Sequence, residues 1–198
     1  MTQSASPRLI LASASPRRRG LLEEAGFSFT VEPSGVDEDA VRNLYPIDLA
    51  LHLAVAKADA IAARFPDDVV LAADTVVAFG DRSLGKPASE EEATQMLRLL
   101  SGTTHIVITG VAVVHKSAHR HALARVMSAV RMKLLNDAEI ARYVQGGDWQ
   151  GKAGGYGIQD ADPFVTRVSG CHTNIVGLPM KTTARLLSEA GIVPRPVS

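Results

Sequence analysis

Apolar residues recur along the chain at two spacings, which together predict alternating strands and helices. Residues 69–79 are apolar on both faces, apart from Asp74 and Thr75, which is typical of a central buried strand. Residues 46–65 instead place apolar side chains at a helical period. The other segments predict strands at 9–12, 27–31, 104–115, 123–134 and 164–168, and helices at 16–25, 89–101, 136–145 and 179–190.

This alternation of strands and helices predicts an α/β fold. The chain has 198 residues, a length that suits one domain or two small lobes sharing a core. Hydrophobic residues make up 46% of it and charged residues 21%, which is ordinary globular usage and argues against disorder. Neither an internal repeat nor a linker divides the sequence. We therefore expect one domain over residues 1–198.

Charge and cysteine content restrict the partners and the compartment. The formal net charge is zero, so the basic footprint of a nucleic-acid-binding protein is missing and an anionic ligand needs a local cluster of cations. Cys171 is the only cysteine, which excludes an intramolecular disulfide and favours the cytoplasm. Residues 9–14 are too short an apolar run for export, and no run approaches the roughly 20 apolar residues that cross a bilayer.

The segment from Ser13 to Arg18 lies between a predicted strand and a predicted helix. Free N–H groups at a helix N-terminus attract phosphate, and the hydroxyl of Ser13 with the guanidinium groups of Arg17 and Arg18 would add charge-assisted contacts. The alternative is a capping Ser15 followed by solvated arginines. On either interpretation we expect an exposed Arg18 that contributes little to folding.

Asp74 is a carboxylate inside an otherwise apolar predicted strand. A buried carboxylate is unfavourable unless it is paired, hydrogen-bonded or bound to a metal ion. Asp74 is therefore a candidate ligand for Mg²⁺ or a candidate base that activates water. The structural alternative is a carboxylate bonded to nearby backbone or paired with an internal arginine or lysine.

Three lysines and one acidic loop complete the set of candidate residues. Lys86 lies between a glycine and a proline in a predicted tight turn, and Lys152 precedes a run of glycines, which allow close approach of the backbone to a ligand. Lys57 falls in the predicted helix over 46–65. Glu38, in an acidic loop, is a candidate to complete a metal site with Asp74. Each of these charges alone is more often simply solvated.

Taken in order, these segments resemble the Maf family of nucleotide pyrophosphatases over nearly the whole chain. The matching motifs are residues 9–18, 36–38, 54–58, 73–77, 85–87, 100–102 with His105, 109–111, 152–159 and 176–179. The resemblance implies an elongated α/β fold similar to that of inosine triphosphate pyrophosphatase, with a mixed sheet, flanking helices and a cleft between two lobes. It also implies hydrolysis between the α- and β-phosphates, assisted by a divalent metal cation, Mg²⁺ or Mn²⁺.

Within the family, residues 152–159 resemble the branch acting on dTTP and UTP, and Thr75 suits that branch. The chain departs from the family pattern at Gly170-Cys171-His172, and Asp160 replaces a common glycine. The expected roles are triphosphate binding by Ser13, Arg17, Arg18, Lys57, Lys86 and Lys152, catalysis by Asp74, Glu38 and Lys86, metal binding by Asp74 and Glu38, and recognition of a base edge by Gln159.

Two other functions stay open at this point. One is hydrolysis of 7-methyl-GTP, the preference of the sister branch. The other is a nucleotide-binding regulator of cell division with slow or incidental hydrolysis. The nucleoside triphosphate is the expected partner, without nucleic acid or membrane, and a homodimer is an open expectation. Both readings need the basic loop, but only an enzyme needs Asp74 and Glu38 as well, so we favour the enzyme.

Overall fold

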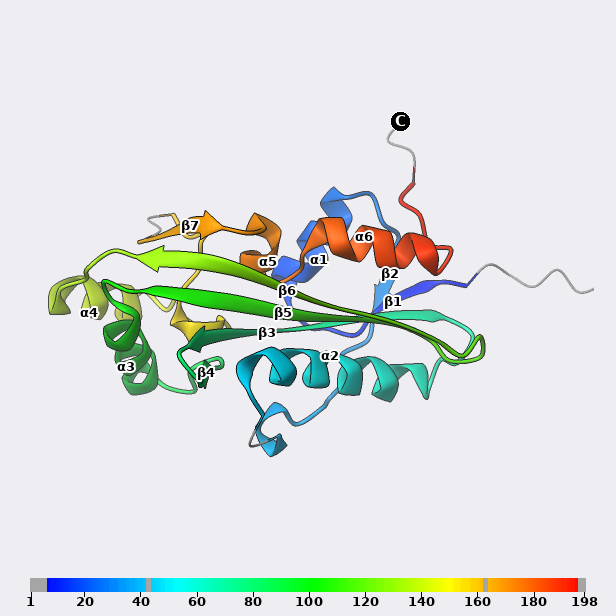
Figure 1. Ribbon diagram of the computed structural model, residues 1–198, viewed down its shortest axis with the longest axis horizontal. Coiled ribbons are helices and arrows are strands. Elements are labelled where there is room, and N and C mark those ends of the chain that lie inside the picture. The colour runs from blue at the N-terminus through cyan, green and yellow to red at the C-terminus, as the bar shows by residue number, and fades with distance from the viewer. Residues whose placement is uncertain (1–6, 42–43, 162–163, 196–198) are drawn as a thin grey trace, which may run out of the picture.

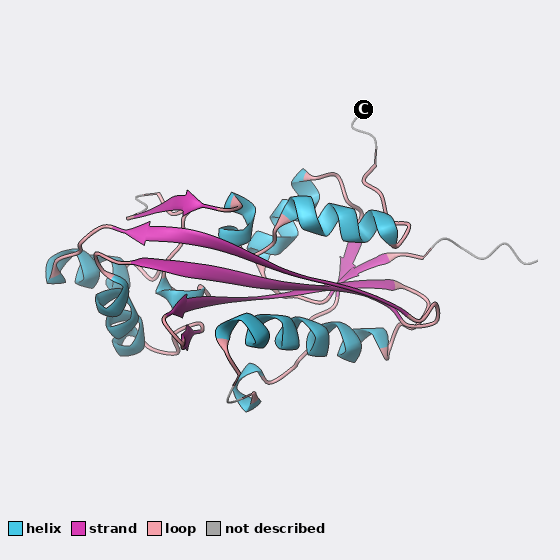
Figure 2. Ribbon diagram, in the orientation of Figure 1, coloured by secondary structure: helices cyan, strands magenta, loops and turns pink. Residues whose placement is uncertain are grey.

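A computed structural model describes residues 7–41, 44–161 and 164–195, in which one mixed sheet runs through the molecule (Figure 1; Figure 2). Its strand order is β2-β1-β3-β5-β6-β7, and β4 pairs with β3. The strands are β1 (Leu9–Leu11), β2 (Phe29–Val31), β3 (Val69–Phe79), β4 (Arg82–Leu84), β5 (Thr104–His115), β6 (Arg120–Met132) and β7 (Val165–Ser169).

Strand β3 joins the two halves of this sheet. It is parallel to β1 and antiparallel to β4 and β5, and β5 continues into β6 through a hairpin. Successive residues of β3 point into different cores: Val70 packs with the cluster around Ile61, and Leu71 with the cluster around Leu22. Both faces of β3 are therefore covered, as the unbroken apolar pattern predicts.

Helices cover the two faces of the sheet and one of its ends (Figure 1). Helix α2 packs on one face against β3 and β5, and α1, α5 and α6 lie on the other side. Helices α3 and α4 lie together at the end of the sheet opposite the tip of the β5–β6 hairpin. The bounds are α1 (Pro16–Glu24), α2 (Pro46–Ala62), α3 (Glu90–Leu100), α4 (Asp137–Gln145), α5 (His172–Val176) and α6 (Met180–Glu189).

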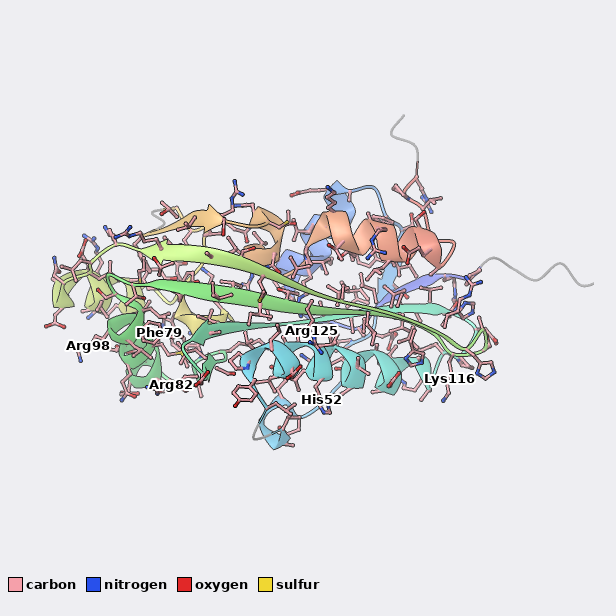
Figure 3. The ribbon with its side chains drawn as sticks, viewed as in Figure 1. His52, Phe79, Arg82, Arg98, Lys116 and Arg125 are labelled. Carbon is pink, nitrogen blue, oxygen red and sulfur yellow. The ribbon has the colours of Figure 1, made fainter. Side chains whose placement is uncertain are left out.

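Two contacts position α2 on the sheet. Gly110 of β5 lies so close to α2 that an added Cβ would collide with the Ala50 backbone, so glycine is required here for packing. Arg125 of β6 points toward α2, where its guanidinium lies 3.1 Å from the Asp48 carboxylate (Figure 3). These contacts fix the helix that carries Lys57.

The predicted α/β class with a mixed sheet and flanking helices is confirmed, and the predicted helix starts at Pro16, Ser89 and Asn136 agree with the observed caps. Two short elements, β4 and α5, were not expected. The cores at the two ends of the sheet are separate clusters, and β3 contributes residues to both; the single domain over residues 1–198 stays a prediction. In the part of the chain that the structure describes, no helix is long and apolar enough to span a membrane.

Candidate active site

A cavity of about 460 Å³ opens between the two ends of the sheet. One side, here called the charged wall, is lined by residues 13–18 with Glu38, Lys57, Thr75 and Lys86. Asp74 is counted with this wall because its carboxylate is paired with Lys57. The other side, here called the glycine wall, consists of residues 150–160. Ser13, Arg17, Arg18, Glu38, Lys57, Lys86, Lys152 and Gln159 all line this cavity. Asp74 lines an adjoining cavity of about 830 Å³, which shares Glu38 and Lys86 with the first.

The loop from β1 to α1 forms the start of the charged wall. Ser15 caps α1 by accepting a hydrogen bond from the Arg18 backbone N–H, at 3.4 Å, and Pro16 begins the helix. The Ser13 hydroxyl is buried and accepts from the Ser15 N–H at 3.2 Å. The N-terminus of α1 therefore faces the cavity, with its partial positive charge toward any anion there.

Arg18 is buried, so the expectation of an exposed arginine was wrong. Only 8% of the residue is exposed. Its guanidinium donates to the Gly177 carbonyl at 2.9 Å, the Thr75 hydroxyl at 3.1 Å and the Ser13 hydroxyl at 3.2 Å. Burial lowers the pKa of Arg18, and the nearby charges of Asp74 and Glu38 oppose that shift. Arg18 thus holds β3, α1 and the loop after α5 together besides facing the cavity.

Lys57 joins the two predicted metal ligands. Its Nζ lies 2.6 Å from Asp74 Oδ1 and 2.7 Å from Glu38 Oε1, and Lys86 Nζ lies 3.0 Å from Glu38 Oε2. Partial burial raises the pKa of Glu38, but hydrogen bonds and charge from Lys57 and Lys86 outweigh burial and hold it at about 2. The pairing of Asp74 with an internal lysine, weighed above as a structural alternative, is therefore observed, and Lys57 and Lys86 keep the Glu38 carboxylate ionised at neutral pH.

The carboxylates of Asp74 and Glu38 are the groups of this cluster that could bind a divalent cation. Within the described residues, no group of three or more His, Cys, Asp or Glu side chains could hold a metal ion by itself. Asp74 and Glu38 do offer hard oxygen donors that converge on one ammonium group. Mg²⁺ keeps several waters and binds through one or two carboxylates plus substrate phosphates. The two carboxylates fit a metal ion that arrives with a triphosphate.

On the glycine wall, Lys152 is paired rather than free. Its Nζ forms an ion pair with Asp160, and only 14% of its side chain is exposed. Gln159 is exposed at the cavity. Arg17 crosses the cavity from the other side and donates to the Gly151 carbonyl at 2.8 Å. Arg17 thus links the two walls.

The prediction of a tight turn around Lys86 was wrong. Residues 85–87 form an irregular segment after β4 without a hydrogen-bonded turn. The Gly85 carbonyl instead accepts from the Gly154 N–H at 2.9 Å. The backbone beside Lys86 is therefore tied to the glycine wall, which sets the position of Lys86 at the rim of the cavity.

Several residues of the site carried little or no signal in the sequence. Thr75 bonds to both Arg18 and the Thr109 hydroxyl, the latter at 2.9 Å. The His105 imidazole lies 2.6 Å from the Tyr156 hydroxyl beneath the glycine wall, and burial lowers the pKa of His105 to about 4. A polar residue inside an apolar strand, such as Thr75 and Thr109, was the one available signal.

Comparison with known proteins gives consistent matches over almost the whole chain. Residues 8–190 match the family described as Maf-like protein. A dTTP/UTP pyrophosphatase from Hyphomonas neptunium is 52% identical over 188 residues, covering 94% of this chain and 97% of that protein. A dTTP/UTP pyrophosphatase from Caulobacter vibrioides is 47% identical over 193 residues, covering 96% and 100%. A solved HAM1 protein from Coxiella burnetii, with 15% identity and a TM-score of 0.39 over 64% of this chain and 73% of that one, is too distant to carry an argument.

Proposed function

Because this chain belongs to the Maf-like protein family, we propose that it hydrolyses dTTP and UTP to the nucleoside monophosphate and pyrophosphate. The observation that carries the proposal is the charged wall, where cations and the Glu38 carboxylate line one cavity, and Asp74, paired with Lys57, lines the adjoining one. The names of the relatives above support the choice of substrate. The expected cellular role is removal of unwanted nucleotides from the pool, in the cytoplasm.

The cations of the cavity bind the triphosphate. Arg17 and Lys86 are partly exposed at the opening of the cavity. Arg18 is buried and stabilises the start of α1. Because these donors are held before substrate arrives, they stabilise the negative charge of the transition state with little reorganisation. Lys57 lies deeper, between the two carboxylates, and holds them in place.

The carboxylates handle water and the metal. Asp74 orients a water molecule toward the α-phosphorus and accepts its proton, while the bond from the α-phosphorus to the bridging oxygen breaks and pyrophosphate leaves. A divalent cation, Mg²⁺ or Mn²⁺, held by Asp74 and Glu38, would supply neutralisation of phosphate charge. Asp74 would thus act both as the base and as a metal ligand, and Glu38 as a metal ligand alone.

The base lies toward the glycine wall. Gln159 offers both a donor and an acceptor, which match the imide edge of uracil or thymine. Apolar side chains that line the cavity, including Val77, Val107, Tyr156 and Ile175, provide a surface for the base plane. The homodimer stays a prediction.

Pyrophosphate release from a panel of nucleotides tests the proposal. The purified protein is assayed with dTTP, UTP, CTP, ATP, GTP and 7-methyl-GTP, each with Mg²⁺ and with Mn²⁺. We expect kcat/KM for dTTP and UTP to exceed that for the other nucleotides by about 10-fold or more. A preference for 7-methyl-GTP would move the chain to the sister branch. Tight binding of dTTP without turnover would favour the regulator.

A further inference from the structure

Asp160 accepts three donors with one carboxylate. Lys152 Nζ forms an ion pair with Oδ1, the Tyr143 hydroxyl donates to Oδ2 at 2.7 Å, and the Gly157 N–H donates to Oδ2 at 2.9 Å. Only 11% of the Asp160 side chain is exposed. A largely buried carboxylate with three satisfied donors is held firmly in one position.

The three donors come from different parts of the structure. Lys152 lies at the start of the glycine wall, Gly157 lies near its end, and Tyr143 belongs to α4. The Tyr143 ring packs edge-on against Phe164, with centroids 4.8 Å apart. Burial and the neighbouring Asp160 raise the pKa of Tyr143, so its hydroxyl keeps its proton and donates. Asp160 therefore ties both ends of the glycine wall to a rigid helix.

The backbone between these ties needs such support. Gly151, Gly154 and Gly155 all have positive φ, between 67° and 74°. Glycine adopts positive φ about as readily as negative φ, so these residues do not fix the backbone conformation by themselves. At Gly157 an added Cβ would lie 2.5 Å from Asp160 Oδ1, so the carboxylate lies directly against the chain. The segment held in this way carries Tyr156 and Gln159 into the cavity.

We propose that Asp160 is a positioning residue that fixes the glycine wall and thereby sets which nucleobase the cavity accepts. This inference rests on the proposed function. Asp160 acts through the wall, because its carboxylate is already engaged by three donors. Lys152 is one of the three donors to Asp160. Its charge therefore helps to orient the glycine wall instead of binding phosphate. Asp74 and Glu38 on the charged wall are both held by Lys57, which lies outside the glycine wall, so turnover of bound substrate should change little.

The test replaces Asp160 by asparagine, which keeps the shape and removes the charge. We expect KM for dTTP and UTP to rise about 10-fold, as for one lost charge-assisted bond, with kcat within about 3-fold of the unsubstituted protein. The ratio of kcat/KM for dTTP to that for CTP should fall at least threefold. Tyr143→Phe, which removes one donor, should shift both quantities in the same direction by less. Asp59→Asn, the same change on the exposed face of α2, is the matched control.

Hydrogen–deuterium exchange separates this inference from the proposed function, because it needs no turnover. In Asp160→Asn, peptides covering residues 151–159 should exchange faster, while peptides from β3 and β5 keep their rates. Unchanged KM, selectivity and exchange would overturn the inference. An equal loss of kcat for every nucleotide, with faster exchange throughout, would make Asp160 merely structural. If the unsubstituted protein releases no pyrophosphate, exchange and calorimetric binding of dTTP and CTP still decide between these results.

Discussion

The two walls of the cavity differ in the kind of element that carries their polar groups. The charged wall is built from β3, α1 and α2, and its key groups are buried and bonded to one another: Arg18 is 8% exposed, Lys57 5% and Asp74 4%. The glycine wall is an irregular segment whose shape depends on a few anchoring contacts. The difference suggests that groups acting on phosphates common to all nucleotides lie on rigid elements, and groups that select a base lie on a segment that can vary.

The rigidity of the charged wall has an energetic consequence. Removing one partner from a buried ion pair or hydrogen-bond network leaves the other without compensation, which typically destabilises by several kcal/mol. Function and stability are therefore coupled on this side of the cavity. On the glycine wall, removing one partner of a bonded pair should loosen a loop. We therefore expect such a change to affect nucleotide selectivity more than the free energy of unfolding. The predictions below test that contrast.

Arg18→Ala should have the largest effect, since it removes a cation and the bond network of three segments. We expect a loss of about 2–4 kcal/mol in transition-state stabilisation and about 3 kcal/mol in the free energy of unfolding. Steady-state kinetics and urea unfolding measure the two. Arg19→Ala, one residue along on the exposed side of α1, is the control. Loss of activity with unaltered stability would contradict the structural role derived from its burial.

Asp74→Asn should come next. The amide keeps the shape of the carboxylate but neither accepts a proton nor carries charge, so we expect kcat to fall at least ~100-fold. Lys57 retains Glu38 as its partner, and the circular dichroism spectrum should stay that of the folded protein. Asp68→Asn is a poor control because Asp68 is paired with Arg8, so the exposed Asp59→Asn is used again. Near-normal turnover by folded Asp74→Asn would exclude Asp74 from the chemistry.

The elements that follow from local chemistry were predictable from the sequence. The capping serine, the proline at the first helical position and the unbroken apolar run are local signals, and residues near them come together in the fold: Ser13 and Arg17 line the cavity, and Asp74 lines the adjoining one. The predictions missed what depends on tertiary contacts. Arg18 is buried because α5 packs over α1, and α5 has only five residues, too few to show a period.

The pairing partners were equally hidden in the sequence. Lys57 and Asp74 lie on different elements, and only the packing of α2 on β3 brings them within 2.6 Å. Lys152 was expected to face phosphate because it precedes glycines, but the acid that pairs with it, Asp160, was noted only as a departure from the family pattern. A sequence shows which groups are available, and the fold decides which of them neutralise each other.

The His105–Tyr156 pair beneath the glycine wall makes stability depend on pH. Burial lowers the pKa of His105 from 6.5 to about 4, so below pH 6.5 the unfolded chain binds a proton that the folded protein does not. Stability is therefore complete above pH 6.5 and falls as pH drops toward 4, by about 2 kcal/mol at pH 5. Urea unfolding at pH 7 and pH 5 measures this. His105→Gln should lose most of the dependence, and the exposed His121→Gln should keep it.

Gln159→Ala should have the smallest effect and the most selective one. The glutamine amide can pair with the imide edge of uracil or thymine, and a site built on such pairing rejects a mismatched edge because its own groups are left unsatisfied. Removing the amide should lower the preference for dTTP and UTP over CTP about tenfold, equivalent to about 1.4 kcal/mol.

The contrast between the walls determines how this result must look. Gln159 is exposed and takes part in neither the Lys57–Asp74 nor the Lys152–Asp160 ion pair, so unfolding stability should stay within about 0.5 kcal/mol of the original value. Inhibition by inorganic tripolyphosphate, which carries no base, should also stay the same, since the charged wall is intact. Gln145→Ala, an exposed glutamine of α4 outside the cavity, is the matched control. If Gln159→Ala weakened the binding of tripolyphosphate as much as the binding of dTTP, the glutamine would take part in phosphate binding. The assignment of phosphate binding to one wall and base selection to the other would then be wrong.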